Sequence, residues 1–119
     1  MLKVLVVDDD PVNREIFRWS LAPHCDLHER GGGVGAAADI AEHEYDVVLL
    51  DAMMPVVDGR EVIAELAEAR RDLLPRILVV TAATHPGLLE DLAGYEIAGV
   101  VDRPYDPDLI RRLLDRFEP

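Results

Sequence analysis

The sequence predicts an α/β fold, a doubly wound parallel sheet of five strands with five flanking helices. Short apolar runs alternate with segments of helical period five times, and the connections are too short to hold both a hairpin and a helix. Right-handed crossovers between parallel strands then place helices on both faces of the sheet. The 119 residues leave no room for a second domain, so we expect a single domain over residues 1–119.

Four of the expected strands are short aliphatic or β-branched runs. They are residues 3–7 (KVLVV), 46–50 (DVVLL), 76–80 (RILVV) and 98–101 (AGVV). Runs this apolar are typical of strands that are covered on both faces. A fifth run, residues 25–29 (CDLHE), alternates apolar with polar side chains. This more polar pattern predicts a strand at the sheet edge.

Five segments carry apolar residues at helical spacing, and each predicts an amphipathic helix. The stripes are Val12, Ile16, Phe17 and Leu21; Val34, Ala37, Ala38 and Ala41; Val62, Ile63, Leu66 and Ala67; Leu88, Leu89, Leu92 and Ala93; and Leu109, Ile110, Leu113, Leu114 and Phe117. Asp10 and Asp106 each precede a proline. This pairing predicts an N-cap carboxylate before a proline at the first helical position.

The composition argues against several classes of protein. Asp and Glu number 24 against 12 Lys and Arg, which gives a formal net charge of −12, and no basic run exceeds two residues. Because this excess repels phosphates, we expect neither direct nucleic acid binding nor binding to anionic membranes. The single cysteine fits a reducing cytoplasm, and no apolar run approaches the roughly 20 residues of a membrane span. We therefore expect a cytoplasmic location.

Polar side chains follow four of the five expected strands. They are Asp8, Asp9 and Asp10 after the first strand, Asp51 after the third, Thr81 after the fourth and Arg103 after the fifth. In doubly wound sheets, ligands bind outside the carboxyl ends of the strands, where the strand order reverses. If the order is the flavodoxin-like 2-1-3-4-5, then Asp8, Asp9 and Asp51 meet at that point. Asp10 is better explained as the helix cap.

Three carboxylates at one point favour a bound cation. Two unit charges 4 Å apart repel each other by about 4 kcal/mol at an effective dielectric near 20. Oxygen ligands with retained waters favour Mg²⁺. A bound Mg²⁺ would hold one oxygen of an incoming phosphoryl group, with Asp51 as nucleophile, Thr81 as hydroxyl donor and Arg103 as the opposing cation. The set predicts phosphoryl transfer to a carboxylate.

Four segments of the chain share a pattern with a known family. They are residues 4–11 (VLVVDDDP), 47–59 (VVLLDAMMPVVDG), 79–83 (VVTAA) and 101–108 (VDRPYDPD). Together they resemble the receiver domain of two-component response regulators and hybrid kinases, and the resemblance covers the whole chain. The second segment is the most specific, because an apolar strand that ends in Asp is followed by Met-Pro and then by Asp-Gly.

The resemblance implies a signalling domain instead of an enzyme. Asp51 would accept the phosphoryl group from the phosphohistidine of a sensor histidine kinase or phosphotransfer protein. Asp9 would bind Mg²⁺ directly, Asp8 mainly through water, and the backbone carbonyl of Met53 would be a further ligand. Thr81 would be the switch hydroxyl, and its movement would carry the signal to the fourth helix, fifth strand and fifth helix, where a downstream protein partner binds.

Two positions depart from the pattern of the family. Arg103 stands where the family usually has Lys, and its guanidinium is planar and forked. Val100 stands where the family usually has Tyr or Phe, whose rotation reports the phosphorylation state. These departures favour an alternative, a pseudo-receiver that binds its partners independently of phosphorylation.

Two further alternatives belong to other classes of protein. Asp8 and Asp10 fit the start of haloacid-dehalogenase-type phosphatases, as nucleophile and general acid, but no second acidic pair follows the fourth strand and the Asp51 pattern is unexplained. Residues 33–38 (GVGAAA) fit the G-x-G-x-x-A pattern of dinucleotide binders, but they follow the polar edge strand instead of a central one.

Overall fold

The five strands form one parallel sheet in the order β2-β1-β3-β4-β5, as predicted. A computed structural model of the chain describes residues 1–81, 86–102 and 106–118. The strands are β1 (Lys3–Val7), β2 (Asp26–Arg30), β3 (Val47–Leu50), β4 (Ile77–Thr81) and β5 (Gly99–Asp102). Each bound lies within one residue of its predicted place, and the polar strand β2 is at an edge of the sheet.

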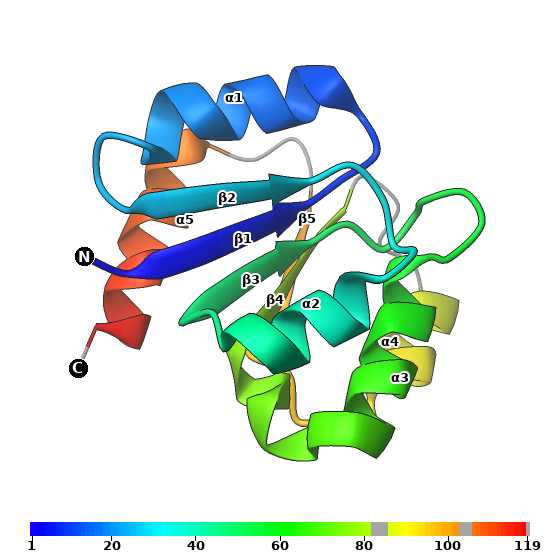
Figure 1. Ribbon diagram of the computed structural model, residues 1–119. Helices are drawn as coiled ribbons and strands as arrows, with labels where there is room; N and C mark the ends of the chain where they lie inside the picture. The colour runs from blue at the N-terminus through cyan, green and yellow to red at the C-terminus, as the bar shows by residue number, and fades with distance from the viewer. Residues whose placement is uncertain (82–85, 103–105, 119) are drawn as a thin grey trace.

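Helices cover both faces of the sheet (Figure 1). The helices α1 (Pro11–Leu21) and α5 (Pro107–Leu114) pack on one face, and α2 (Ala36–His43), α3 (Gly59–Arg70) and α4 (Pro86–Leu92) pack on the other. Two short 3₁₀ helices, η1 (Arg71–Arg76) and η2 (Asp115–Phe117), were not predicted. Among the described residues, none of the helices combines the length and the hydropathy needed to cross a membrane.

The hydrophobic core is divided into two layers by the sheet. In β1, Leu5 and Val7 contribute to the layer under α2, α3 and α4, whereas Val4 and Val6 contribute to the layer under α1 and α5. Successive side chains of a strand point to opposite faces, so one apolar run supplies both layers. This is why the central strands read as continuous apolar runs in the sequence.

Aspartate caps begin three of the helices. Asp10 Oδ1 accepts a hydrogen bond from the backbone N–H of Val12 at 2.9 Å, and Asp106 Oδ1 accepts one from Asp108 at 2.9 Å. Both predicted caps are therefore confirmed. Asp58 caps α3 and exchanges hydrogen bonds with Glu61 in a capping box, which was not predicted.

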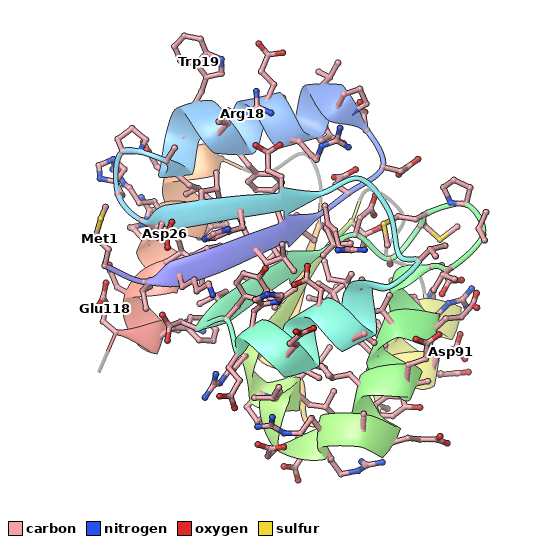
Figure 2. All side chains as sticks on the ribbon, in the orientation of Figure 1. Met1, Arg18, Trp19, Asp26, Asp91 and Glu118 are labelled. Carbon is pink, nitrogen blue, oxygen red and sulfur yellow. The ribbon has the colours of Figure 1, made fainter. Side chains whose placement is uncertain are left out.

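The apolar stripes of the helices are only partly buried. In α1, Phe17 and Leu21 are buried, but Val12 and Ile16 are exposed, so only part of the predicted apolar stripe faces the core. Val12 and Ile16 share their side of the helix with Trp19, which is also exposed. Trp19 projects away from the sheet (Figure 2). The cause is geometric, since a helix lying on a sheet buries only the side that faces the strands. For the same reason Ala38 of α2 and Leu89 of α4 are exposed, whereas Val34 and Ala93 are exposed because they lie outside these two helices.

Candidate functional site

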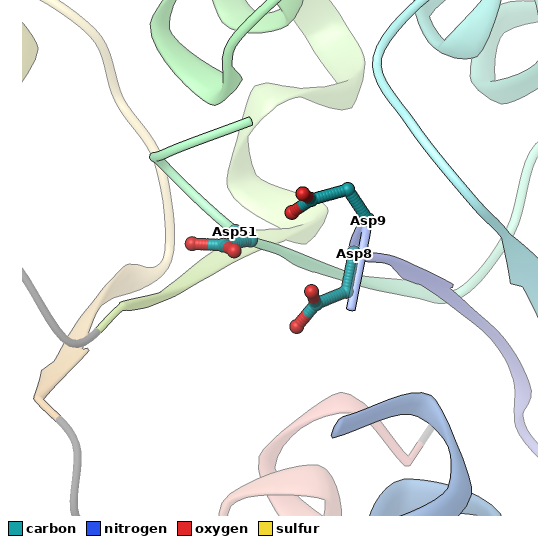
Figure 3. A group of neighbouring side chains, drawn as sticks. All are labelled: Asp8, Asp9 and Asp51. Carbon is teal, nitrogen blue, oxygen red and sulfur yellow. The ribbon is translucent and has the colours of Figure 1, made fainter. Parts of the chain in front are cut away.

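Asp8, Asp9 and Asp51 lie together at the carboxyl edge of the sheet (Figure 3). Val7 pairs with Leu50, so the residues that follow β1 and β3 are neighbours. One carboxylate oxygen from each aspartate lies within 4.8 Å of the other two. Asp8 and Asp51 are 1% and 7% exposed, whereas Asp9 is exposed to solvent. The predicted cluster is confirmed, with two buried carboxylates and one open to solvent.

Backbone hydrogen bonds fix the positions of the two buried aspartates. The N–H of Asp51 donates to the carbonyl of Val7 at 3.0 Å, and the N–H of Asp8 donates to the carbonyl of Arg30 at 3.1 Å. These bonds continue the pairing of the strands by one residue beyond their ends. Both aspartates are therefore held by the frame of the sheet instead of by a loose loop.

The carboxylates are also oriented by the backbone that follows them. Asp8 Oδ1 accepts a hydrogen bond from the N–H of Asp10 at 2.9 Å, and Asp51 Oδ1 accepts one from the N–H of Met53 at 3.1 Å. Contacts of this kind, to a backbone group two residues later, hold an aspartate side chain in one orientation. The two side chains are thus placed before any ligand arrives.

The electrostatics of the cluster favour a bound cation. For the buried pair Asp8 and Asp51, whose nearest carboxylate oxygens lie within 4.8 Å of each other, the repulsion is at least about 3.5 kcal/mol at an effective dielectric of 20. All the side-chain donors are carboxylate oxygens, which are ligands of hard cations such as Mg²⁺. The residues present therefore fit a divalent cation.

Of the two other side chains predicted for the site, Thr81 and Arg103, the structure describes only Thr81. Thr81 is the last residue of β4, its side chain is fully buried, and it pairs in register with Asp102 of β5. Val79 pairs with Leu50, so Thr81 lies further along the sheet, beside the chain that follows Asp51. Arg103 lies outside the described residues, so the structure says nothing of its predicted place.

Arg14 of α1 supports the site and was missed by the sequence argument. Its Nη1 donates to the backbone carbonyl of Asp8 at 2.7 Å, and its Nε lies 3.5 Å from a carboxylate oxygen of Glu29 in β2. Arg18, one turn later, donates two hydrogen bonds to the same carboxylate at 2.7 and 2.8 Å. The hydrogen bond from Arg18 lowers the pKa of Glu29, against the opposing effect of burial. The sequence did not indicate these contacts of Arg14, because they depend on how α1 packs beside β2.

A pocket opens beside Asp9, between the loop after β2 and the loop after β3. It is lined by Asp9, Arg30, the glycine-rich residues 31–33, Val34, Pro55 and Val56. From the sequence, residues 33–38, which include part of this glycine-rich run, fit a dinucleotide-binding pattern, and nothing placed them near the aspartates. Its place beside the acidic cluster follows from the strand order, because β2 lies next to β1.

Comparison with known proteins gives one consistent result. A model of the response regulator receiver domain matches residues 4–115 of the chain. The response regulator MprA of Mycobacterium sp. (strain KMS) is 39% identical over 117 residues, which are 98% of this chain and 49% of the relative. The chain thus spans about half the length of the curated relatives it matches.

Solved structures share the fold over nearly the whole chain. The chemotaxis protein CheY4 of Vibrio cholerae has a TM-score of 0.86 and 25% identity, with 99% of each chain covered. The receiver domain of the sensor histidine kinase PA1611 from Pseudomonas aeruginosa PAO1 has a TM-score of 0.84 and 24% identity, covering 98% of this chain and 96% of that one. The latter structure has a magnesium ion coordinated in its active site cleft.

Proposed function

This chain belongs to the response regulator receiver domain family, and on that basis we propose that residues 1–119 form one receiver domain that accepts a phosphoryl group on Asp51. The donor is the phosphohistidine of a sensor histidine kinase or of a phosphotransfer protein. The observation that carries the proposal is the cluster of Asp8, Asp9 and Asp51, with the buried Asp51 at the end of a central strand. Membership of the family favours this function over the phosphatase and the dinucleotide binder.

The transfer step uses the carboxylate of Asp51 as nucleophile. One oxygen of Asp51 forms a bond to phosphorus, the P–N bond of the phosphohistidine breaks, and its electron pair leaves with the imidazole. The contact from the N–H of Met53 to Oδ1 holds the carboxylate still while this happens. Positioning of this kind is the main contribution that proteins make to phosphoryl transfer.

Asp8, Asp9, Asp51 and the backbone carbonyl of Met53 would hold Mg²⁺. When bound, the ion supplies positive charge that offsets the carboxylates and the phosphoryl oxygens. The three side chains are already gathered within 4.8 Å, which supports this assignment. The magnesium-containing receiver domain from Pseudomonas aeruginosa, which has the same fold, is consistent with it.

Thr81 and Arg103 complete the proposed switch. The hydroxyl of Thr81 is drawn towards the phosphoryl oxygens, and Arg103 supplies the opposing positive charge. Their movement alters the surface of α4, β5 and α5, where a downstream protein binds. Val100 of β5 is half-buried and packs against the core layer under α2, α3 and α4.

A phosphorylation assay tests the function directly. Incubation with Mg²⁺ and a small phosphodonor should add one phosphoryl group by intact-mass measurement, and Asp51→Asn and Asp51→Ala should abolish the gain. Modification of Asp8 with Asp51 untouched would favour the phosphatase. Failure of small donors and histidine kinases alike to modify any aspartate would favour the pseudo-receiver that binds partners independently of phosphorylation.

A further inference from the structure

Arg60 of α3 forms ion pairs with two aspartates from different parts of the chain. Its Nη1 donates a hydrogen bond to Asp91 of α4 at 2.6 Å, and its Nη2 donates one to Asp58, the N-cap residue of α3, at 3.2 Å. Asp91 lies 31 positions further along the chain. The side chain of Arg60 therefore connects the loop that precedes α3 with the helix α4.

The first end of this connection, at Asp58, lies close to the phosphoacceptor. Asp58 is the last residue of the loop that follows Asp51, and it closes the capping box at the start of α3. The next residue, Gly59, donates its N–H to the carbonyl of Ala52 at 3.0 Å. The start of α3 is thus bonded to the residue that follows Asp51. A displacement of this backbone would move the start of α3 and, with it, Arg60.

The second end of the connection holds α4 at its flank. Leu88 and Leu92 of α4 are buried in the core layer under α2, α3 and α4. Asp91 lies on the exposed flank of the same helix, and its side chain is 51% exposed. A pocket lies between this flank and α3, which runs beside α4 (Figure 1), and Arg60 and Asp91 both line it. The ion pair therefore joins the two helices across a pocket instead of across closely packed side chains.

We propose that Arg60 is a positioning residue that couples the phosphorylation state of Asp51 to the placement of α4, through its contacts with Asp58 and Asp91. The inference rests on the proposed function, in which phosphorylation alters the surface of α4, β5 and α5. It adds a connection that begins at the backbone after Asp51 and passes through α3, separate from the hydroxyl of Thr81. Such a contact couples the two sites only if its strength differs between the two states of the domain.

Variants of Arg60 test the connection, with a control on the same helix. Arg60→Met keeps most of the apolar stem and removes both ion pairs. Arg60→Asp places a carboxylate between Asp58 and Asp91, and adding Asp91→Arg to it restores a bridge of reversed polarity. Arg70→Met is the control, because Arg70 also belongs to α3 but binds Glu44, at the end of α2, at 2.7 Å.

The measurement is amide hydrogen exchange in α4, with and without the phosphoryl mimic beryllofluoride, in the presence of Mg²⁺. In the wild-type chain beryllofluoride should change the exchange rate of the peptide that covers residues 86–92. In Arg60→Met and Arg60→Asp the ratio of the two rates should move towards one by up to about fivefold, the effect of losing an exposed ion pair. The double variant should restore the wild-type ratio, and Arg70→Met should leave it unchanged. Phosphorylation of Asp51 by a small phosphodonor should persist in every variant.

Other results would overturn the inference. Faster exchange in the Arg60 variants, to the same extent with and without beryllofluoride, would show that Arg60 only holds α4 in place. Failure of the double variant to restore the ratio, or an equal loss in Arg70→Met, would show that the pairing with Asp91 is not what matters. A wild-type α4 that does not respond to beryllofluoride, in a chain that is phosphorylated on Asp51, would overturn the inference and spare the acceptor. Failure of every donor to modify Asp51 would instead remove the proposed function.

Discussion

Gly59 lies directly against the backbone of Asp51. A Cβ atom on Gly59 would lie 2.5 Å from the carbonyl oxygen of Asp51 and 2.8 Å from the Cα of Ala52. The N–H of Gly59 also donates to the carbonyl of Ala52 at 3.0 Å. The first residue of α3 is therefore packed onto the end of β3. This contact gives a physical reason for the Asp-Gly pair of the motif, since Asp58 caps the helix and Gly59 makes room for the backbone of Asp51.

The first prediction concerns this contact. Gly59→Ala should destabilise the fold by about 1 to 3 kcal/mol, because the obstructing atoms belong to the backbone and cannot rotate away. It should also slow phosphorylation, since any relief displaces Asp51. Urea unfolding measures the first effect and mass spectrometry with a small phosphodonor measures the second. Gly94→Ala, where the added Cβ meets open space, is the control. Equal stability of the two variants would contradict the prediction.

Sequence periodicity predicted the strands well because the central strands are buried on both faces. The runs in β1, β3 and β4 are apolar except for Lys3 at the start of β1 and Thr81 at the end of β4, and strands of this kind are covered by helices on both sides. It predicted the burial of α1 poorly. Val12 and Ile16 have the same spacing as core residues, and the spacing alone does not distinguish a side that packs on the sheet from one that faces solvent.

The candidate site was predictable to the extent that it depends on strand order. Once β1 and β3 are neighbours, the residues after them must meet, which is why Asp8 and Asp51 were found. Arg14 and the pocket beside Asp9 depend on contacts between segments far apart in the chain. The φ angle of Val56 is 69°, in the left-handed region. The sequence could not predict this angle, because a β-branched residue is the least expected one in that region.

A second prediction concerns the divalent cation. Mg²⁺ should raise the free energy of unfolding, because it binds the native state that gathers the three carboxylates. At ten times the dissociation constant the gain is about 1.4 kcal/mol. Thermal melts with and without Mg²⁺ measure it, and chelation by EDTA should reverse it. Asp9→Asn should weaken the effect, whereas Asp91→Asn on α4, outside the cluster, should not. A midpoint insensitive to millimolar Mg²⁺ would refute the metal site.

A third prediction concerns the acid stability of the network around Asp39. Tyr45 Oη donates to Asp39 at 3.0 Å, and Arg30 and His43 contact the same carboxylate at 3.1 and 2.7 Å. Burial alone would raise the pKa of Asp39, but the hydrogen bonds from Tyr45, Arg30 and His43 outweigh it and lower that pKa. Burial and the bond to Asp39 together raise the pKa of Tyr45 to about 12.

The sign of the pH dependence follows from the lowered pKa of Asp39. The network stabilises the fold fully above the ordinary carboxyl pKa, and this contribution is lost as pH falls through the lower pKa of the folded state. Tyr45→Phe should therefore cost about 1 kcal/mol at pH 7 and less near pH 2. Urea unfolding across this range measures the difference. A cost that is the same at both ends would show that the charge of Asp39 plays no part.

A fourth prediction concerns Arg103, which lies outside the described residues. If its guanidinium pairs with the phosphoryl oxygens, Arg103→Lys should preserve phosphorylation and strengthen the coupling to the surface of α4, β5 and α5. Arg103→Ala should lose that coupling. The measurement is the affinity of a downstream partner for the phosphorylated and unphosphorylated forms. If all three proteins show the same change in affinity, Arg103 forms only a surface ion pair, which is worth about 1 kcal/mol at most.

The last prediction tests whether Arg14 positions the metal site. Arg14 donates to the carbonyl of Asp8, whereas Arg18, one turn away, donates to the carboxylate of Glu29. Arg14→Leu should weaken Mg²⁺ binding by about tenfold, because losing a group that orients a ligand has an effect of that size. Arg18→Leu removes a cation from the same carboxylate, that of Glu29, and should leave the Mg²⁺ affinity within about twofold, because the side chain of Arg18 is 55% exposed and its charge is screened by solvent. Isothermal titration of Mg²⁺ into both variants compares them. If the two arginines prove equivalent, the effect on Mg²⁺ is one of net charge, and the hydrogen bond from Arg14 to Asp8 is not what holds the site in place.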